Sequence, residues 1–403
     1  MNVGDNMKKV TILALHLGYG GIERAIANLA NFICDDYDVT IVSTYKLYEQ
    51  PVYEFDSKIK IEYLMDGTIA LKVSAYKQLL KERKIMKLTK LLMQNYLKKG
   101  KVKEFFQDIK MSAQNVKEKK NKMISYIKAC DSDIIISTRD IHNTWLGQYG
   151  KETSMKIGWE HNHHNGNEKY IHGITKSVQK LDYFVLVSEE LKQFYEKKLE
   201  NTSCKCIYIA NSIDRLPDTL APLEKPHLIS VGRLSPEKGQ FDLIEVMKKL
   251  HPLFPEWTLE IIGDGVLREP LERKIKKEKL TEVIQLSGFQ NQDYIRKQLQ
   301  NSSLFVMTSH TESFGIVLLE AFAYGIPCIA FDSAQGANDI ITNNMNGCLI
   351  PNRDIDFMCK RISDLIKQKA KRNVFGLSAR KTAEKYDAHA IAQEWKCLFE
   401  TKN

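Results

Sequence analysis

The sequence predicts an α/β protein built from two doubly wound parallel-sheet domains. Short runs of β-branched and aromatic residues alternate with segments of helical period along most of the 403 residues. One proline-rich stretch, residues 215–226, interrupts this alternation, and the length of the chain is typical of two domains. We therefore expect residues 1–214 and 227–385 to be two domains joined by a linker.

The first domain is expected to open with a βαβ unit, in which a strand over 10–15 leads through the glycine-rich turn 18–21 into a helix over 22–32. Glycines after a first strand bring a backbone close to phosphate, but a tight turn needs them too, so both interpretations of Gly20 and Gly21 stay open. The remaining elements expected in this domain are strands at 37–43, 134–137, 155–159, 183–187 and 206–209, with a helix from Ser188.

The second domain repeats the pattern, and its central stretch is 310–331, which is expected to form a loop, an apolar helix and a buried strand. Ser313 is the expected N-cap of that helix, and Gly325 followed by Pro327 is expected to end it. The other expected elements are strands at 227–231, 258–262, 283–286, 304–307 and 347–350 and helices at 241–250, 267–278 and 293–299, with three more helices after the last strand. Ligands of such sheets bind beyond the carboxyl ends of the strands, so the cleft between the domains is the expected site.

Positive charge is concentrated in one block of the chain. Residues 72–128 hold 17 Lys or Arg and four acids, a net +13 within a total of +9, so the rest of the chain is at −4. Apolar residues at helical spacing predict two or three basic amphipathic helices within an insertion at about 70–128. A solvated lysine face and attachment to an anionic membrane surface are equally compatible with this pattern. Nucleic acid ranks last, because the block has no aromatic stacking platform.

The composition also limits localisation. The sequence has no run of 18 apolar residues free of charges and helix breakers, so a membrane span is not expected. The apolar N-terminal stretch runs into the glycine turn rather than a cleavage site, which argues against a signal peptide. The eight cysteines are scattered, as is usual for reduced thiols. We expect a cytoplasmic protein, or one peripheral on the inner face of the plasma membrane.

Two loops of the second domain hold the charged candidates for a ligand site. Arg233 and Lys238 flank a helix start after the strand at 227–231, an arrangement that suits a diphosphate but is also compatible with a solvated turn. Glu312 and Glu320 are separated by seven residues, and beside a helix N-terminus a glutamate is suited to hydroxyl groups. Within an apolar helix, Glu320 needs a partner, which is either a ribose or a structural Arg or Ser.

A metal is not expected at this site. His161, His163 and His164 lie within four residues, yet no carboxylate or cysteine companion can be named for them, and a single cleft histidine, His161, is the preferred interpretation. The acid pairs at 131–133 and 354–356 lie at the wrong ends of their elements to hold a nucleotide-bound metal, and the pair Cys204 and Cys206 lacks a second pair.

Four motifs follow one another along the chain: the GG turn, VGRLSPEKG at 231–239, GDG at 263–265 and ESFGIVLLE at 312–320. Together and in this order, they resemble the motifs of the retaining glycosyltransferases of family 4. The resemblance covers nearly the whole chain, is strongest over 231–331 and is loosest over 70–128. It implies the GT-B fold, in which two Rossmann-like domains face each other across a cleft. It also implies that the last helix, within 386–403, returns to the N-terminal domain.

The resemblance assigns roles to single residues. It implies catalytic roles for Arg233 and Lys238 on the diphosphate, for Glu312 on the donor sugar and for His161 near that sugar. The donor-binding residues that it implies are Gly20, Gly21, Asn211, Gly263, Ser309, Phe314, Gly315 and Glu320. Residues 335–339 depart from the usual glycine-proline-acid pattern, which leaves the identity of the donor sugar open.

The reaction implied is transfer of a hexose or N-acetylhexosamine from a UDP-sugar to a hydroxyl of a lipid-linked or cell-surface glycan. Retention comes from the family resemblance, and no cofactor is expected. A catalytically silent partner subunit of the same fold would normally lack the charged site residues. It is disfavoured because Arg233, Lys238, Glu312 and Glu320 are all present. A peripheral membrane scaffold and a nucleotide-sugar hydrolase or epimerase of the same fold remain as alternatives.

Overall fold

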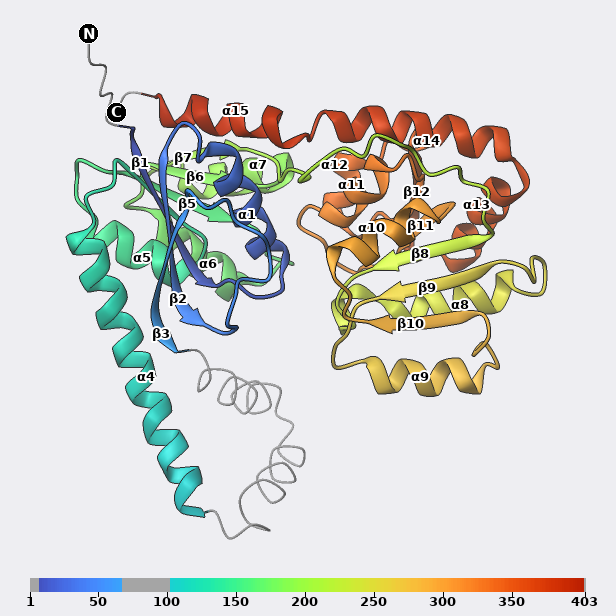
Figure 1. The fold of residues 1–403 in the computed structure, drawn as a ribbon, viewed down its shortest axis with the longest axis horizontal. Helices are drawn as coiled ribbons and strands as arrows, with labels where there is room; N and C mark the ends of the chain where they lie inside the picture. Colours follow the sequence, from blue (N-terminus) through green and yellow to red (C-terminus); the bar gives the residue numbers. More distant parts are fainter. Residues whose placement is uncertain (1–6, 67–101, 402–403) are drawn as a thin grey trace.

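The computed structural model describes residues 7–66 and 102–401, which form two lobes side by side (Figure 1). The N-lobe holds a seven-stranded sheet and the C-lobe a six-stranded sheet, and all strand pairs in both are parallel. The predicted fold class, two doubly wound parallel sheets of the GT-B type, is confirmed.

The N-lobe sheet has the order β3-β2-β1-β4-β5-β6-β7, so the strand order reverses between β1 and β4. Its strands are β1 (Lys9–His16), β2 (Asp38–Lys46), β3 (Lys60–Asp66), β4 (Ile134–Ser137), β5 (Met155–Glu160), β6 (Tyr183–Leu186) and β7 (Lys205–Tyr208). Its helices are α1 (Gly21–Ile33), α4 (Val102–Ala129), α5 (Asp140–Tyr149), α6 (Glu168–Val178) and α7 (Glu189–Leu199). The central strands are almost wholly buried, as continuous apolar runs between two helical layers require.

The C-lobe sheet has the order β10-β9-β8-β11-β12-β13 and reverses between β8 and β11. Its strands are β8 (His227–Val231), β9 (Thr258–Ile262), β10 (Ile284–Gly288), β11 (Leu304–Met307), β12 (Cys328–Phe331) and β13 (Gly347–Ile350). The helices are η2 (Pro236–Lys238), α8 (Gln240–Leu250), α9 (Arg268–Lys277), α10 (Gln292–Gln300), α11 (Ile316–Ala323), α12 (Gln335–Ile340), η3 (Pro351–Arg353), α13 (Ile355–Lys367) and α14 (Lys369–Glu384).

The chain crosses between the lobes twice. It leaves the N-lobe after β7, and it returns when α14 of the C-lobe is followed by α15 (Ala388–Phe399), which lies along the N-lobe (Figure 1). Trp395 of α15 is 1% exposed, and its ring packs edge-on against Trp159 of the N-lobe at 4.8 Å between centroids. A second anchor is the ion pair between Lys8 and Glu400 at 2.7 Å. Both ends of the described chain therefore lie on the N-lobe.

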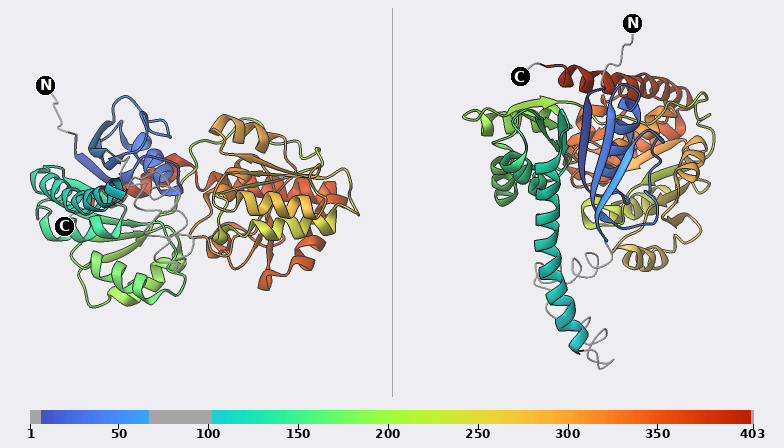
Figure 2. Two further views of the ribbon diagram at one scale, coloured as in Figure 1. Left: turned by 90° about the horizontal axis from the view of Figure 1, so that it is seen from below. Right: turned by 60° about the vertical axis from the view of Figure 1, so that its left-hand side comes forward.

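Several elements differ from the sequence-based expectation. The strand β3 and the helices α5, α6 and α12 were not predicted, and only α12, with six residues, is short for its type. In the predicted basic insertion, 102–129 form one long helix, α4, which extends away from the N-lobe sheet (Figures 1 and 2), whereas 67–101 lie outside the described residues. Within the described part of the chain, no helix has both the length and the apolar character needed to cross a bilayer.

The expected N-cap at Ser313 is wrong. The helix α11 begins at Ile316, and its cap is Gly315, whose φ of 92° lies in the left-handed region and which makes no side-chain capping bond. Residues 312–315 instead continue the loop, because Glu312 is tied to the next segment through its carbonyl, which accepts the Gly336 N–H at 2.8 Å. The apolar run was located correctly, but a local capping rule could not detect a glycine cap fixed by tertiary contacts.

Candidate active site

The candidate site lies where strand order reverses in both sheets. In the N-lobe, the loops after β1 and β4 meet at this point, and in the C-lobe, the loops after β8 and β11 do so. Crevices at such switch points are the usual ligand sites of doubly wound sheets. Six of the predicted site residues, Arg233, Lys238, Ser309, Glu312, Phe314 and Gly315, lie in the two C-lobe loops.

The loop after β8 approaches the loop after β9 so closely that only glycine fits between them. Gly263 has a φ of 139°, and a Cβ on it would lie 2.0 Å from the carbonyl oxygen of Gly232. The carbonyl of Arg233 accepts a hydrogen bond from the Gln240 side chain at 2.6 Å, which fixes the loop against the start of α8. The local backbone is therefore rigid where Arg233 projects.

The positive charge of Arg233 acts across the boundary between the lobes. Its charge acts on two N-lobe groups, contributing to the lowered pKa of His16 and opposing the raised pKa of Glu23. Burial is the largest cause of both shifts, and the pKa of His16 is lowered to about 4. The charge of Arg233 is therefore close enough to act on both N-lobe groups.

Lys238 and Glu312 are brought together as an ion pair, with 2.5 Å between Nζ and Oε2. The two loops that carry them are bonded to each other, since the His310 N–H donates to the Glu237 carbonyl at 2.8 Å and the Thr308 hydroxyl to the Lys238 carbonyl at 3.3 Å. Lys238 and Glu312 are 74 residues apart in sequence, and these bonds between the loops hold the two side chains next to each other.

The start of α11 lies in the same loop region. Gly315 caps the helix, and Phe314 before it is 2% exposed. A Cβ on Gly336 would lie 2.4 Å from the backbone nitrogen of Phe314, so the glycine at 336 allows this close packing. The first-turn N–H groups of a helix have no partner within the helix and carry partial positive charge, which suits an anionic group.

Glu320 does not join Lys238 and Glu312. Its carboxylate forms an ion pair with Arg24 of α1 in the opposite lobe, and both side chains are 9% exposed. Arg24 also approaches Asp214 at 3.5 Å, and Asp214 pairs with Arg296 of α10 at 2.7 Å. Of the two partners expected for Glu320, a ribose or a structural arginine, the structure provides the arginine.

The N-lobe side of the crevice holds a second charged group. Glu23 of α1 is buried and accepts a hydrogen bond from Arg139 at 3.0 Å, next to His16. A Cβ on Gly20 would lie 2.0 Å from the Glu23 carboxylate, whereas nothing lies within 4 Å of one on Gly21. Within the predicted glycine turn, Gly21 is therefore the glycine with open space beside it.

His161 and Asn211 lie apart from the Lys238 and Glu312 pair. His161 directly follows β5, is 9% exposed, and has no hydrogen-bond partner on either ring nitrogen among the described residues. Burial lowers its pKa to about 3, so the ring is neutral near pH 7. Asn211 lines a small cavity between α1 and α15, where Trp159 and Trp395 also lie, and not the C-lobe loops.

The sequence analysis missed residues that shape the site. Arg353 of η3 donates to the carbonyls of Thr308 and Ser309 at 3.0 and 2.9 Å and pairs with Asp242 of α8, so it holds the loop before α11 in place. An arginine in a short turn gives no local signal of this role. Tyr19 stacks across the crevice on Phe289, with ring centroids 5.1 Å apart. Arg24, Glu23 and Arg139 were missed because each depends on a partner from a distant segment.

Comparison with known proteins gives one family match and several similar chains. Residues 213–382 match the family described as Glycosyl transferases group 1. The chain is 24% identical to an exopolysaccharide phosphotransferase of Streptomyces coelicolor over 94% of its own length and 39% of that protein. It is 26% identical to an uncharacterized glycosyltransferase of Haemophilus influenzae over 98% of its length and 100% of that protein. A structure of TarM from S. aureus, in complex with fondaparinux, α-GlcNAc-glycerol and UDP, superposes with a TM-score of 0.75, 18% identity and coverage of 98% and 100%.

The two lobes therefore have the GT-B fold. The segment 213–382, which matches the Glycosyl transferases group 1 model, contains Arg233, Lys238, Glu312 and Glu320. The chain spans 39% of the length of the Streptomyces relative and the whole length of the Haemophilus relative.

Proposed function

We propose that the protein is a retaining glycosyltransferase that transfers a hexose or N-acetylhexosamine from a UDP-sugar to a hydroxyl group of a glycan acceptor. The observation that carries the proposal is that Arg233, the Lys238 and Glu312 pair and the start of α11 all belong to the two loops at the switch point of the C-lobe sheet. The UDP and α-GlcNAc-glycerol in the TarM complex support a nucleotide-sugar donor and a glycosylated product.

In this proposal, the C-lobe supplies electrostatic stabilisation. As the bond between the sugar and the diphosphate breaks, negative charge develops on the leaving UDP, and Arg233, Lys238 and the first-turn amides of α11 offset it. Lys238 is paired with Glu312 in the described structure, so a bound diphosphate competes with that carboxylate for the ammonium group. Glu312 is then released toward the hydroxyl groups of the donor sugar.

Retention is proposed without a base from the protein. The departing phosphate oxygen accepts the proton of the acceptor hydroxyl on the face from which the phosphate leaves. His161, neutral because burial lowers its pKa, is suited to hydrogen bonding with a sugar hydroxyl rather than to carrying charge. We also propose that this chemistry needs no metal, because the two cations and the helix terminus supply the positive charge.

The acceptor is proposed to be lipid-linked or part of a cell-surface glycan, such as capsule, teichoic acid or lipopolysaccharide. Support comes from the name of the Streptomyces relative, an exopolysaccharide enzyme, and from the net charge of +13 in residues 72–128. A basic segment of this kind is attracted to an anionic leaflet. The protein would then work in the cytoplasm, at the inner face of the membrane.

The proposal is tested by incubating the full chain with a panel of UDP-sugars, with and without a lipid-linked glycan, and measuring both free UDP and glycosylated product. A transferase releases UDP together with product, and only when the acceptor is present. UDP released equally without acceptor indicates a hydrolase, and a changed sugar without UDP release indicates an epimerase. Either of these outcomes contradicts the proposal, as does inactivity with every donor and acceptor.

The substitution Lys238→Ala is expected to lower kcat by about 100-fold or more, because it removes a charge that is needed more in the transition state than in the ground state. Circular dichroism checks that the fold is kept. Lys249→Ala is the matched control, since Lys249 lies on α8, the helix that follows η2, but pairs with Asp356 on an exposed surface. Turnover that is equal in the two variants would remove Lys238 from the mechanism.

A further inference from the structure

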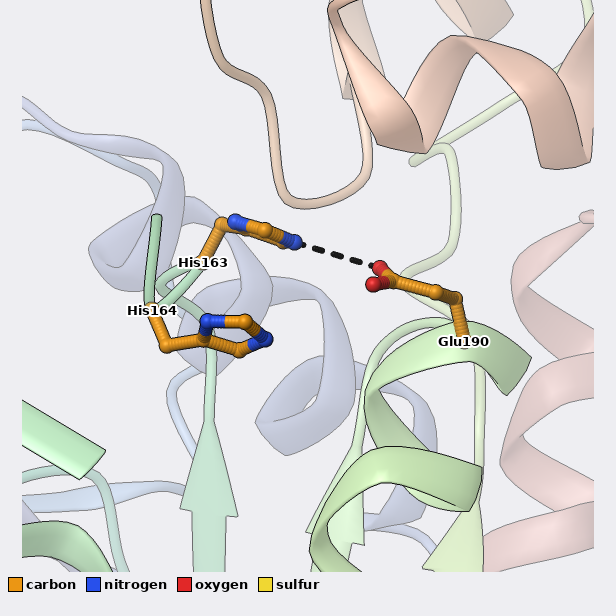
Figure 3. Close-up of side chains that lie close together, drawn as sticks. All are labelled: His163, His164 and Glu190. Carbon is orange, nitrogen blue, oxygen red and sulfur yellow. Dashed lines mark hydrogen bonds and ion pairs between the residues drawn. The ribbon is translucent and has the colours of Figure 1, made fainter. Parts of the chain in front are cut away.

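Three side chains that the proposed reaction does not use lie together on the N-lobe (Figure 3). His163 and His164 come from the loop after β5, and Glu190 is the second residue of α7, which follows the neighbouring strand β6. One potential ligand atom from each lies within 4.8 Å of the other two. A metal was not expected here, because no carboxylate companion could be named from the sequence, and the sheet topology provides one.

The pair His163 and Glu190 already has the spacing of two metal ligands. The His163 Nε2 lies 3.2 Å from the Glu190 Oε2, and the histidine side chain is 5% exposed. Around a tetrahedral zinc with bonds of about 2.0–2.2 Å, neighbouring ligand atoms are roughly 3.3–3.5 Å apart. The other ring nitrogen, Nδ1, lies 2.8 Å from the side-chain oxygen of Asn165. The Asn165 backbone N–H also donates to Nδ1 at 3.0 Å, so the ring proton is on Nε2. Metal binding at Nε2 moves that proton to Nδ1, where the side-chain oxygen of Asn165 accepts it.

His164 supplies the third nitrogen. Its ring lies 4.5 Å from that of His163 at an interplanar angle of 26°, and both rings turn their Nε2 atoms toward the side of Glu190 (Figure 3). Its Nε2 is buried and has no hydrogen-bond partner among the described residues. Leaving a buried polar atom unpaired is costly, and a metal would satisfy this one.

Ligation by His164 requires one local adjustment. Its Nδ1 now accepts the Gly166 N–H at 3.0 Å, so the ring proton is on Nε2. Metal binding at Nε2 moves that proton to Nδ1, and the Gly166 amide must then rotate away. Asn165 and Gly166 have φ values of 49° and 66°, so this turn is the part of the loop that would rearrange and bring the third ligand closer.

We propose that His163, His164 and Glu190 form a Zn²⁺ site with three protein ligands and a water molecule in the fourth position. Imidazole and carboxylate ligands suit zinc, and Glu190, whose side chain is 49% exposed, leaves a path for the ion. The site would fasten the loop after β5 to α7, beside the contact between the Glu189 amide and Asp339 of the C-lobe. This inference does not depend on the proposed transferase activity.

The test measures binding of Zn²⁺ alone by titration calorimetry to the full chain without an affinity tag. The exposed Cys397 is first changed to serine, so that its thiol cannot contribute. The expected result is one zinc ion per chain. His163→Ala and Glu190→Gln are each expected to weaken binding about tenfold or more, as loss of a ligand does. His172→Ala, which removes an exposed histidine of the same lobe, is the matched control and should bind as tightly as the parent chain.

Co²⁺ offers a second readout, because its visible absorption is intense only in tetrahedral or five-coordinate sites. These bands are expected in the parent chain and the control and absent in Glu190→Gln. Circular dichroism of the zinc-free variants checks the fold, and if His163→Ala does not fold, His164→Gln and Glu190→Gln decide. Absence of stoichiometric zinc uptake, or equal uptake by the parent chain and the ligand variants, overturns the proposal.

Discussion

Gly263 is a residue whose identity is dictated by the backbone around it. Its φ of 139° disfavours any side chain, and a Cβ would lie 2.0 Å from the Gly232 carbonyl oxygen, which belongs to the loop that carries Arg233. The sequence analysis named this glycine only through the family resemblance. No spacing in the chain shows that two loops approach each other this closely.

Gly263→Ala is therefore expected to lower the free energy of unfolding by about 2 kcal/mol or more, through backbone strain and steric overlap. Gly173→Ala is the matched control, because Gly173 lies inside α6 with nothing within 4 Å of a Cβ. There alanine is expected to stabilise the helix by about 0.5–1 kcal/mol. Urea denaturation measures both changes, and a neutral Gly263→Ala would show that the loop relaxes freely.

His142 makes stability depend on pH. It is fully buried in α5, its Nε2 lies 3.1 Å from the Thr44 hydroxyl, and burial, aided by Lys119 and Arg139, lowers its pKa from 6.5 to about 3. Between these two pKa values, the unfolded chain binds a proton that the folded chain does not. The stabilising contribution is therefore present above about pH 6.5 and declines as the pH falls toward 3.

The expected slope from His142 alone is about 1.4 kcal/mol per pH unit within that window. His142→Gln should reduce the pH dependence of the unfolding free energy by about this amount between roughly pH 6 and pH 5, whatever its effect at neutral pH. His172→Gln, at an exposed position of α6, is expected to keep the parental slope. Identical slopes for the parent chain and His142→Gln would contradict the assignment.

At the scale of elements, α1 and α11 are joined across the crevice by Arg24 and Glu320. Removing one partner of a buried ion pair leaves an uncompensated charge, at a cost of about 3–5 kcal/mol. The family resemblance implies that Glu320 also binds the donor, so a bound donor would have to share this carboxylate with Arg24.

A double-mutant cycle tests this ion pair. Arg24→Met and Glu320→Gln are each expected to destabilise the protein, and the double variant is expected to lose less than the sum, with a coupling energy above about 1 kcal/mol. The exposed pair Lys249 and Asp356, with side chains 48% and 80% exposed, is the control, and its coupling is expected to stay below about 1 kcal/mol. Equal coupling energies in the two cycles would mean that the ion pair between the lobes contributes no more stability than an exposed ion pair.

Elements with strong local signals could be predicted, and those fixed by distant partners could not. The strands β4, β9, β11 and β13 have the bounds expected from their apolar runs. Glu320 was recognised as needing a partner, but Arg24 lies 296 positions earlier and no spacing connects the two. Glu190 escaped notice for the same reason, because the adjacency of β5 and β6 brings it to His163.

At the scale of the whole molecule, the uneven charge predicts salt-dependent membrane binding. Flotation with anionic liposomes is expected to weaken as salt rises, since each well-placed lysine contributes roughly 1 kcal/mol of screened attraction. Lys87→Glu with Lys90→Glu should weaken flotation further, whereas Lys276→Glu with Lys277→Glu, on α9 of the C-lobe, should not. Absence of flotation at low salt would leave a solvated lysine face as the interpretation of this block.

The returning helix has a consequence for biosynthesis. The helix α15 packs on α1 and Trp159, so the C-lobe is inserted in sequence between two parts of the N-lobe. More than 170 residues separate β7 from α15. While the ribosome makes those residues, the apolar side of α1 around Ala25 and Leu29 has no cover. The nascent N-lobe therefore exposes this apolar surface until α15 has been synthesised. We expect this interval to be the one in which it is most prone to aggregation and most dependent on a chaperone.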